Sequence, residues 1–533
     1  MTEVISASEA KRRIHGTEEL ALLDVREHGQ YGEGHLLFAS NCPYSRLELE
    51  APRLVPNPSV PCIIYDDGDG VAERAAGRLA ALDYTRVYVL QDGVRGWAAA
   101  GYGLFKGVNV PSKVFGELVE AVHHTPVISA DQLDQWRAAG RDLLLVDGRP
   151  MADFAKMNIP GARCVPNGEL LYRLGALVKD DETPIVINCA GRTRGLIGAQ
   201  SLISAGLPNP VFALENGTQG WVLSGRELDR RSESLPLPHL SAEEVAQGRD
   251  LAERLAATYR VPSVGAEEVW AWSEDTERTL YLLDVRTEEE FLAGHVAGAR
   301  HAPAVQLVQA TDEWVAVRHA RLALIDDNGL RATTAAFWLR QMGHDAVVVR
   351  EALTEMATQT GPDESPFDSR VPLCCGEISA RELLDANDDA PLLLDIRSSR
   401  AHRKRRIPGS VWSTRARLGR LDLSAASFLV LVADDPRTAR LAACDASALT
   451  DAPILLLKGG VDAWEAAGGG TEPSPAEPDD AEAIDFLQFV HDRHDGNLEA
   501  SRRYLDWETG LVGQLDDQER AEFDVVVVEP AAG

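Results

Sequence analysis

The chain is poor in cysteine, with seven in 533 residues. An odd number of thiols scattered over so long a chain does not form the framework of a disulfide-rich secreted protein. Since no Cys-x-x-Cys pair or Cys/His cluster with zinc spacing occurs, the sequence predicts no metal site. A reducing compartment, the cytoplasm, fits this usage best. The cysteines are Cys42, Cys62, Cys164, Cys189, Cys374, Cys375 and Cys444.

Long apolar runs are missing as well. No stretch of about 18 or more apolar residues occurs, so no membrane-spanning helix is expected. The first 13 residues carry charges and lack an apolar core, which argues against a secretory signal. Positive charge is scarce, since 53 Lys and Arg face 83 Asp and Glu and give a formal net charge of -30. This balance disfavours nucleic acid and anionic membrane as partners.

The chain contains one sequence pattern that occurs four times. Each copy is a short apolar stretch that ends in Asp-x-Arg. Because the copies lie more than 100 residues apart, they indicate tandem domains rather than the stacked units of a solenoid. The length of the chain also requires several domains. The copies are Leu22–Arg26, Leu145–Arg149, Leu282–Arg286 and Leu393–Arg397.

Further landmarks follow each copy in the same order. A Gly-His or Pro-Gly turn comes first and a second apolar strand comes next. Three copies then close on a glycine-rich turn before Trp97, Trp221 or Trp464, and the third copy has lost this piece. Apolar strands alternate with helix-like segments such as 72–82 and 332–342. This order predicts an α/β fold in which each repeat is a mainly parallel sheet flanked by helices.

The residue after the second strand differs among the repeats. It is Cys189 in the second repeat, 42 positions after the motif aspartate, and Asp66 and Asp326 stand at the same distance in the first and third. In the fourth repeat we expect Asp434 in this slot, at a distance of 39. Ligand sites of open α/β sheets lie beyond the carboxyl ends of the strands, which is where this slot falls.

A short loop follows Cys189 and leads into a helix-like segment at 195–205. Backbone N–H groups at a helix start favour an anion, and two arginines add to that field. Such surroundings lower the pKa of a thiol and make its thiolate reactive. The loop consists of Ala190, Gly191, Arg192, Thr193 and Arg194, and either arginine is a candidate for binding the substrate anion.

Asp-x-Arg, Pro-Gly-Ala, strand-Cys-loop-Arg and a glycine-rich turn before Trp, in this order, resemble the rhodanese (sulfurtransferase) domain. The resemblance covers four repeats from about residue 5 to 470. It implies that Cys189 carries a sulfane sulfur as a persulfide, with Ala190 to Arg194 cradling the outer sulfur. Because an aspartate cannot form a persulfide, it also implies one active site per chain. No cofactor is needed for this chemistry.

The resemblance predicts a sulfurtransferase that takes sulfur from thiosulfate or a related anion and gives it to cyanide, a thiol or an acceptor protein. An alternative is a sulfur-carrier or scaffold protein whose cysteine-free repeats dock a donor or acceptor. A cysteine phosphatase is a third hypothesis for the function. However, its Cys-x5-Arg loop is not met here, since Arg194 closes Cys-x4-Arg and Gly195 follows.

The expected domains are residues 1–104 (Asp66 in the slot), 127–230 (Cys189), 263–360 (Asp326, with a degenerate end) and 376–470 (Asp434). An acidic helical tail, 481–533, follows. Within this tail, 484–490 and 500–511 are expected to form an amphipathic helical hairpin that packs on the other domains. A Ser-Ala-Glu-Glu start predicts a capped helix from Ser241 to Tyr259, with Glu244 completing the capping box.

Other residues have a structural interpretation. The Asp-x-Arg pairs recur where there is no cysteine, so an internal ion pair is expected, and Trp221 is expected in the core. Cys374 and Cys375 are expected to be neutral loop thiols, with a redox role as the alternative. The other cysteines apart from Cys189 are expected to be structural, namely Cys42, Cys62, Cys164 and Cys444. Glu169 and Arg173 are weaker candidates for the lining of the cleft. The pairs His123-His124 and His491/His494 are expected at solvated helix ends.

Overall fold

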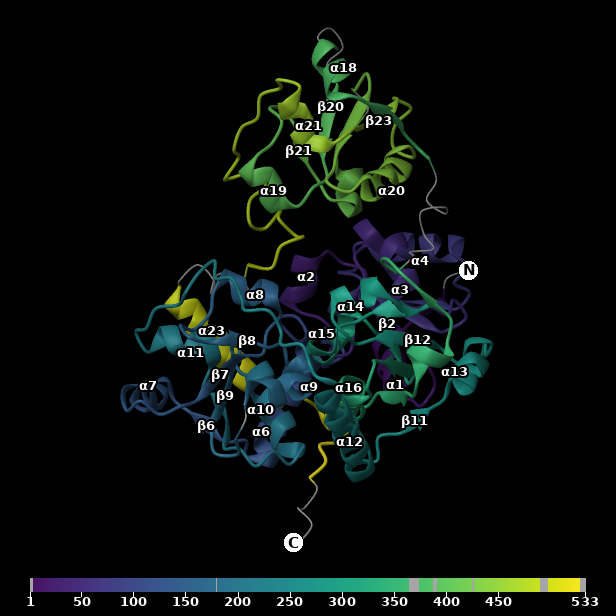
Figure 1. Ribbon diagram of the computed structural model, residues 1–533. Coiled ribbons are helices and arrows are strands. Elements are labelled where there is room, and N and C mark those ends of the chain that lie inside the picture. Colours follow the sequence, from purple (N-terminus) through teal and green to yellow (C-terminus); the bar gives the residue numbers. More distant parts are fainter. Residues whose placement is uncertain are drawn as a thin grey trace. The chain divides into compact units, whose positions relative to one another are not determined.

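The computed structural model describes residues 3–178, 180–363, 373–386, 391–423, 426–488 and 497–527. The chain divides into two compact units. The first comprises residues 1–12, 22–108 and 365–488, and the second comprises residues 13–21, 109–364 and 489–533. The first unit therefore holds nearly all of the first repeat and the fourth, and the second unit holds the second and third repeats. Figure 1 labels many of the helices and strands of both.

The elements of the first repeat alternate between strand and helix. The sheet order is β1-β5-β4-β2, and β3 pairs with β2. The strands are β1 (Glu3–Ile5), β2 (Leu20–Asp24), β3 (Ser40–Asn41), β4 (Cys62–Tyr65) and β5 (Val87–Leu90). The helices are α1 (Ala7–Ile14), α2 (His28–Glu33), α3 (Leu47–Leu54), α4 (Val71–Ala81) and α5 (Gly93–Ala99).

The second repeat has the sheet order β6-β10-β9-β7-β8 and is preceded by α6 (Val110–His123). Its strands are β6 (Val127–Ile128), β7 (Leu144–Asp147), β8 (Arg163–Cys164), β9 (Ile185–Asn188) and β10 (Val211–Leu214). Its helices are α7 (Ala130–Ala138), α8 (Met151–Lys156), α9 (Asn167–Leu177), α10 (Thr193–Ser204) and α11 (Gly217–Leu223).

The third repeat follows α12 (Ala242–Tyr259) and has the order β11-β17-β16-β12-β14, with β13 and β18 forming a separate antiparallel pair. The strands are β11 (Ser263–Val264), β12 (Leu280–Asp284), β13 (His295–Val296), β14 (Arg300–His301), β16 (Arg321–Ile325), β17 (Asp345–Val349) and β18 (Thr358–Gln359). The helices are α13 (Ala266–Ser273), α14 (Glu288–Ala293), α15 (Ala304–Gln309), α16 (Leu330–Gln341) and α17 (Ala352–Glu355).

The fourth repeat has the order β19-β23-β22-β20-β21. The strands are β19 (Gly376–Ile378), β20 (Leu392–Asp395), β21 (Val411–Trp412), β22 (Leu429–Val432) and β23 (Ile454–Leu457). The helices are α18 (Ala380–Asp385), α19 (Ser399–Lys404), α20 (Pro436–Ala446) and α21 (Gly460–Ala466). In the tail lie α23 (Leu498–Thr509) and α24 (Asp517–Ala521).

The four sheets share one strand order, and the pairings that define this order are parallel. The central strands are buried along their whole length, as β4, β9 and β22 show. Continuous apolar strands are typical of parallel sheets covered on both faces. The predicted fold class, a repeated α/β domain with a mainly parallel sheet, is confirmed.

Two local predictions have different outcomes. The capped helix is confirmed, because Ser241 and Glu244 form a reciprocal capping box at the start of α12. The helical hairpin in the tail is wrong in its first half. Ile484 and Asp485 lie in a turn and the next two residues have no regular structure, and the Gln30 N–H of α2 donates to the carbonyl of Ile484 over 3.2 Å. Residues 489–496, which include His491 and His494, lie outside the described residues.

One thiol prediction is also corrected. Cys374 and Cys444 form a disulfide across 70 residues of sequence, so neither is a free thiol. Cys375 beside them is free and partly buried, and Cys42, Cys62, Cys164 and Cys189 are free and buried. Sequence spacing does not reveal the pair, because the fold alone brings Cys374, two residues before β19, next to α20.

Candidate active site

The Asp-x-Arg motif forms a buried frame in every repeat. In the second repeat, Arg149 Nε and Nη2 donate to the two carboxylate oxygens of Asp147 over 2.9 and 2.7 Å. Arg149 also donates to the carbonyl of Met157 over 2.6 Å, which holds the chain after α8. Both side chains are almost fully buried. The same pairs are Asp24/Arg26, Asp284/Arg286 and Asp395/Arg397. The predicted structural ion pair is therefore confirmed.

A second shared feature fixes which residue fills the slot. The residue after each motif aspartate donates its N–H to the last residue of the second strand, and the slot is the next residue along the chain. This register identifies the slot as Asp66, Cys189, Asp326 and Ala433. The acceptors are Tyr65, Asn188, Ile325 and Val432.

The expectation of Asp434 in the fourth slot is therefore wrong by one residue. The connection in this repeat is shorter, 38 positions from Asp395 to Ala433 against 42 in the other three, so counting from the motif aspartate cannot give the register. The neighbouring Asp435 instead caps α20, where its carboxylate accepts the N–H of Arg437 over 2.9 Å. Ala433 offers neither a nucleophile nor a charge.

In the first and third repeats, the carboxylate of the slot aspartate accepts hydrogen bonds from the backbone that follows it. Asp66 accepts the N–H groups of Gly68 and Ala72 over 2.8 and 2.9 Å. Asp326 accepts those of Gly329, Arg331 and Ala332 over 2.7 to 3.2 Å. The loop after the strand is thus an anion cradle built from backbone N–H groups. Burial, opposed by the charge of Arg331, raises the pKa of Asp326 to about 6.

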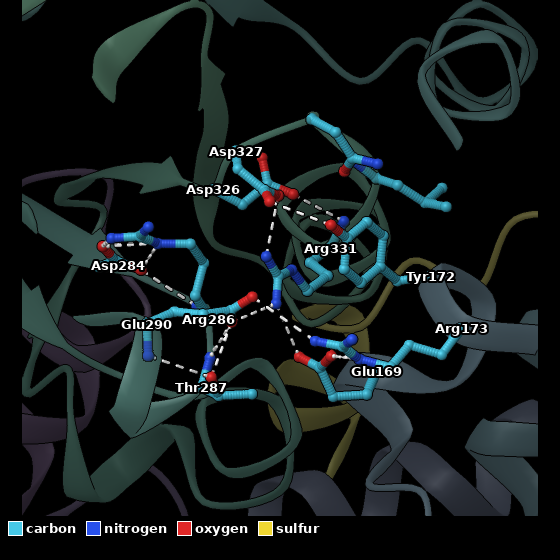
Figure 2. Close-up of polar contacts among 12 residues, drawn as sticks. Glu169, Tyr172, Arg173, Asp284, Arg286, Thr287, Glu290, Asp326, Asp327 and Arg331 are labelled. Atoms are coloured by element: carbon cyan, nitrogen blue, oxygen red, sulfur yellow. Dashed lines mark hydrogen bonds and ion pairs between the residues drawn. The ribbon is translucent and has the colours of Figure 1, made fainter. Parts of the chain in front are cut away.

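Arg331 lies beside the third slot and among several carboxylates, as Figure 2 shows. Its guanidinium has no exposed surface and donates to Asp327, Glu290 and Glu169 over 2.8, 2.7 and 2.9 Å. Glu169 belongs to α9 of the second repeat and also binds Arg173 over 2.6 Å. The prediction that Glu169 and Arg173 line the cleft of Cys189 is wrong, because both join this cluster of the third repeat.

Cys189 stands between the end of β9 and the start of α10. Its carbonyl accepts the N–H of Thr218 over 2.8 Å, and that of Ala190 accepts the N–H of Gln219 over 3.1 Å. The first turn of α11 thus holds the cysteine loop. Gly217 makes this approach possible, because its φ is +52° and a Cβ there would lie 2.2 Å from the carbonyl oxygen of Cys189. Trp221 is buried on the same helix, as predicted.

The charge state of Cys189 reflects opposing influences. Burial is the largest and raises the pKa of the thiol, which is only 2% exposed. The guanidinium of Arg194 and the N–H groups of Gly195 and Gly191 lower this pKa, and the carboxylate of Glu508 raises it. The net result is a pKa above the ordinary value. The expectation of a lowered pKa is therefore wrong for this buried arrangement. Of the two N–H groups that act on the thiol, Gly191 belongs to the predicted loop and Gly195 lies just beyond it.

The two loop arginines lie in different environments. Arg192 turns to α6, where Nε and Nη2 donate to the carboxylate of Glu117 over 2.8 and 3.0 Å and a further ion pair forms with Glu120. Arg194 has a looser ion pair with Asp153, at 3.5 Å, and its charge acts on Cys189. Of the two arginines, Arg194 therefore acts more strongly on the charge of the Cys189 sulfur.

Glu508 of α23 is a site residue that the sequence analysis missed. It is 2% exposed and accepts a hydrogen bond from the Thr193 hydroxyl over 2.9 Å. The amphipathic pattern predicts the helix around it. No local signal, however, tells which face of that helix meets the cysteine loop.

Among the described residues, no group of three or more His, Cys, Asp or Glu side chains could hold a metal ion. Within the same residues, no helix is both long and apolar enough to cross a membrane.

Known proteins resemble this chain at two levels. The family model of the rhodanese-like domain matches residues 6–100, 129–224 and 265–357. The thiosulfate sulfurtransferases of Pseudomonas aeruginosa and Azotobacter vinelandii are 28% and 26% identical over 178 residues, 30% of this chain. These matches span 64% of each curated relative's length.

A solved structure covers nearly the whole chain. The crystal structure of a thiosulfate sulfurtransferase from Pseudomonas aeruginosa is 39% identical, with a TM-score of 0.91, and the alignment covers 99% of this chain and all of that one. The family model matches three of the four repeats, and the fourth has the same strand order. The chain therefore belongs to the rhodanese family.

Proposed function

We propose that the protein is a sulfurtransferase that carries sulfane sulfur as a persulfide on Cys189. The observation that carries this proposal is the comparison among slots. In the first and third repeats the backbone cradle binds a carboxylate, and in the second repeat the same cradle surrounds a thiol. A cradle that stabilises an anion suits both the thiolate and the persulfide anion.

The reaction has two steps of nucleophilic substitution at sulfur. The thiolate of Cys189 attacks the outer sulfur of thiosulfate, the S–S bond of the donor breaks, and sulfite leaves with the electron pair. Cyanide then attacks the outer sulfur of the persulfide and leaves as thiocyanate, which restores the thiolate. A thiol, as its thiolate, takes the sulfur in the same way and becomes a persulfide. Neither step needs a metal or another cofactor.

The loop residues have distinct parts in this proposal. The N–H groups of Gly191 and Gly195 face the sulfur, and Arg194 supplies the positive charge that offsets burial. Arg192 keeps the loop in place through Glu117. Thr193 begins α10, and Ala190 is bound through its carbonyl to α11. One site per chain follows, because Asp66, Asp326 and Ala433 cannot hold a persulfide.

A direct test measures thiocyanate after thiosulfate and cyanide are added to the full chain. Wild type is expected to turn over and Cys189→Ser is expected to show no activity above background. Cys375→Ser, which removes a partly buried free thiol elsewhere, serves as the matched control and is expected to keep the activity. The intact mass after treatment with thiosulfate alone is expected to increase by one sulfur atom. Turnover by Cys189→Ser would refute the proposal.

A second candidate is a sulfur carrier that docks partner proteins, and it is favoured by the burial of Cys189. A thiol that is 2% exposed is poorly placed for rapid exchange with free small molecules. In this case the sulfur would load from a persulfidated protein much faster than from thiosulfate. The cytoplasm is part of the proposal in both cases, since five of the seven cysteines are free thiols.

A further inference from the structure

The helix α23 lies outside the repeats and brings a carboxylate to the cysteine loop. Glu508 Oε1 accepts the hydrogen bond from Thr193. Its Oε2 is buried and has no hydrogen-bond partner among the described residues. A Cβ added to Gly191 would lie 2.8 Å from this Oε2, so the carboxylate is in direct contact with the loop. A buried, half-satisfied carboxylate is costly to the fold, which calls for an explanation.

The carboxylate of Glu508 places a negative charge beside the loop that holds the reacting sulfur. Gly191 and Thr193 both belong to the loop that follows Cys189, and the N–H of Gly191 is one of the groups that face the thiol. The carboxylate of Glu508 acts on Cys189 as a like charge. In the first and third repeats the corresponding loops also receive a carboxylate, but there it comes from the slot residue itself. In the second repeat it comes from a helix outside the repeat.

We propose that Glu508 is a specificity-determining residue of the sulfur-transfer site, one that disfavours donors with two negative charges and favours donors with one, such as the persulfide of a thiol. This inference rests on the proposed function. A donor must place its outer sulfur at Cys189 Sγ, and the remaining atoms of the donor then lie within a few ångströms of the loop and of Glu508.

The charge of the donor decides how strongly Glu508 opposes it. The repulsion between two charges scales with their product, so a dianion meets about twice the repulsion that a monoanion meets at the same distance. Partial screening in a site that opens to admit substrate reduces this difference to a discrimination on the order of tenfold. Arg194 attracts the dianion about twice as strongly as the monoanion, so the wild-type ratio reflects both side chains. The change in the ratio when Glu508 alone is replaced isolates the contribution of Glu508.

Two donors that share the transferred sulfur make the test. Thiosulfate is a dianion, and methanethiosulfonate has a methyl group in place of one oxygen and is a monoanion. With cyanide as acceptor, kcat/KM is measured for both donors with wild type, Glu508→Gln and Glu508→Asp. The ratio of thiosulfate to methanethiosulfonate is expected to rise about tenfold in Glu508→Gln, mainly through a lower KM for thiosulfate. Glu508→Asp keeps the charge and is expected to stay near the wild-type ratio.

Glu499→Gln is the matched control, because Glu499 lies on the same helix and is 77% exposed. It is expected to leave the ratio unchanged. An unchanged ratio in Glu508→Gln would overturn the inference, as would an equal loss of kcat with both donors, which indicates a merely structural role. If Glu508→Gln does not fold, Glu508→Ala removes the same charge and is judged by the same ratio.

The two proposals fail in different ways. If wild type does not load sulfur on Cys189 from either donor, the proposed function is wrong. If wild type loads sulfur and the ratio ignores Glu508, the function stands and only the role of Glu508 is wrong.

Discussion

Replacing Arg331 by methionine would remove the buried cation that joins the second and third repeats. Arg331 has no exposed side-chain surface and binds Glu169 of α9, Glu290 of α14 and Asp327. Methionine has a similar length and no charge, so the volume is largely kept and the carboxylates lose their counter-charge. The expected result is a large loss of stability in the second compact unit.

The size of this loss of stability can be worked out from the carboxylates that Arg331 binds. Burial tends to raise the pKa of Glu290, but the charge and hydrogen bonds of Arg331, with bonds from Thr287, lower it to about 2 from 4.5. That shift corresponds to about 3.4 kcal/mol for a fully shielded group. Because Glu290 is 29% exposed, solvent screening reduces this to about 2 kcal/mol. With the other carboxylates included, the free energy of unfolding is expected to fall by about 4 kcal/mol.

This loss depends on pH with a definite sign. The pKa of Glu290 is lowered in the fold, so the stability it contributes is present above about pH 4.5 and is lost as pH falls toward 2. The pKa of Asp326 is raised to about 6, so its ionised form costs stability as pH rises through 6, and Arg331 offsets part of that cost. Arg331 therefore matters most at neutral pH. At pH 3 the cost of Arg331→Met is expected to be smaller by about 1 kcal/mol or more.

Urea unfolding followed by hydrogen exchange and mass spectrometry measures this locally, in peptides that span α16. Arg340→Met is the matched control, because Arg340 lies on the same helix, is 38% exposed and pairs with Asp345. It is expected to cost less than about 1 kcal/mol at either pH. An equal cost of Arg331→Met at pH 7 and pH 3 would refute the electrostatic argument, and a cost no larger than that of Arg340→Met would refute the role of the cluster.

Three further predictions concern other sites. Arg194→Gln is expected to raise the pKa of Cys189 and to move the pH profile of its alkylation by iodoacetamide upward, whereas Arg192→Gln is expected to move it less. Gly217→Ala is expected to lower thiocyanate formation at least tenfold, because its Cβ would displace the carbonyl of Cys189, and normal activity would contradict this geometry. Cys374→Ser is expected to destabilise the fourth repeat by about 4 kcal/mol, measured by urea unfolding without reductant, and to have no effect in the presence of reductant.

The parts of the fold that the sequence predicts are those set by local pattern. Buried parallel strands appear as short apolar runs, and the start of α12 is visible as a capping box. The place of Cys189 at the end of β9 also follows from local order, since the strand and the cysteine are adjacent in sequence. The buried Asp-x-Arg pair is predictable for another reason, because it recurs where no chemistry needs it.

The parts that the sequence does not predict depend on distant segments or on register. Ala433 occupies the fourth slot because hydrogen bonds between strands, and not the count from Asp395, fix the position. The Cys374–Cys444 disulfide joins residues 70 positions apart. Burial of Cys189 raises its pKa, and this burial is a tertiary effect to which α23 contributes. A local motif specifies which residues form a site, but it does not specify which distant segments pack against that site.

The anion cradle explains how the repeats diverged in chemistry while they kept one fold. A loop of converging N–H groups is unfavourable when buried and empty, because each unpaired donor loses its hydration. Asp66 and Asp326 satisfy their loops with their own carboxylates, so these two repeats need no substrate to be stable. A thiol satisfies the loop less well, and in the second repeat Glu508 comes close to it from a separate helix. The carboxylate of Glu508 is held against this loop by the Thr193 hydroxyl, although its second oxygen is buried without a partner, and it opposes an incoming dianion. Replacing Glu508 is therefore expected to change both the stability of the empty site and its selectivity for the donor.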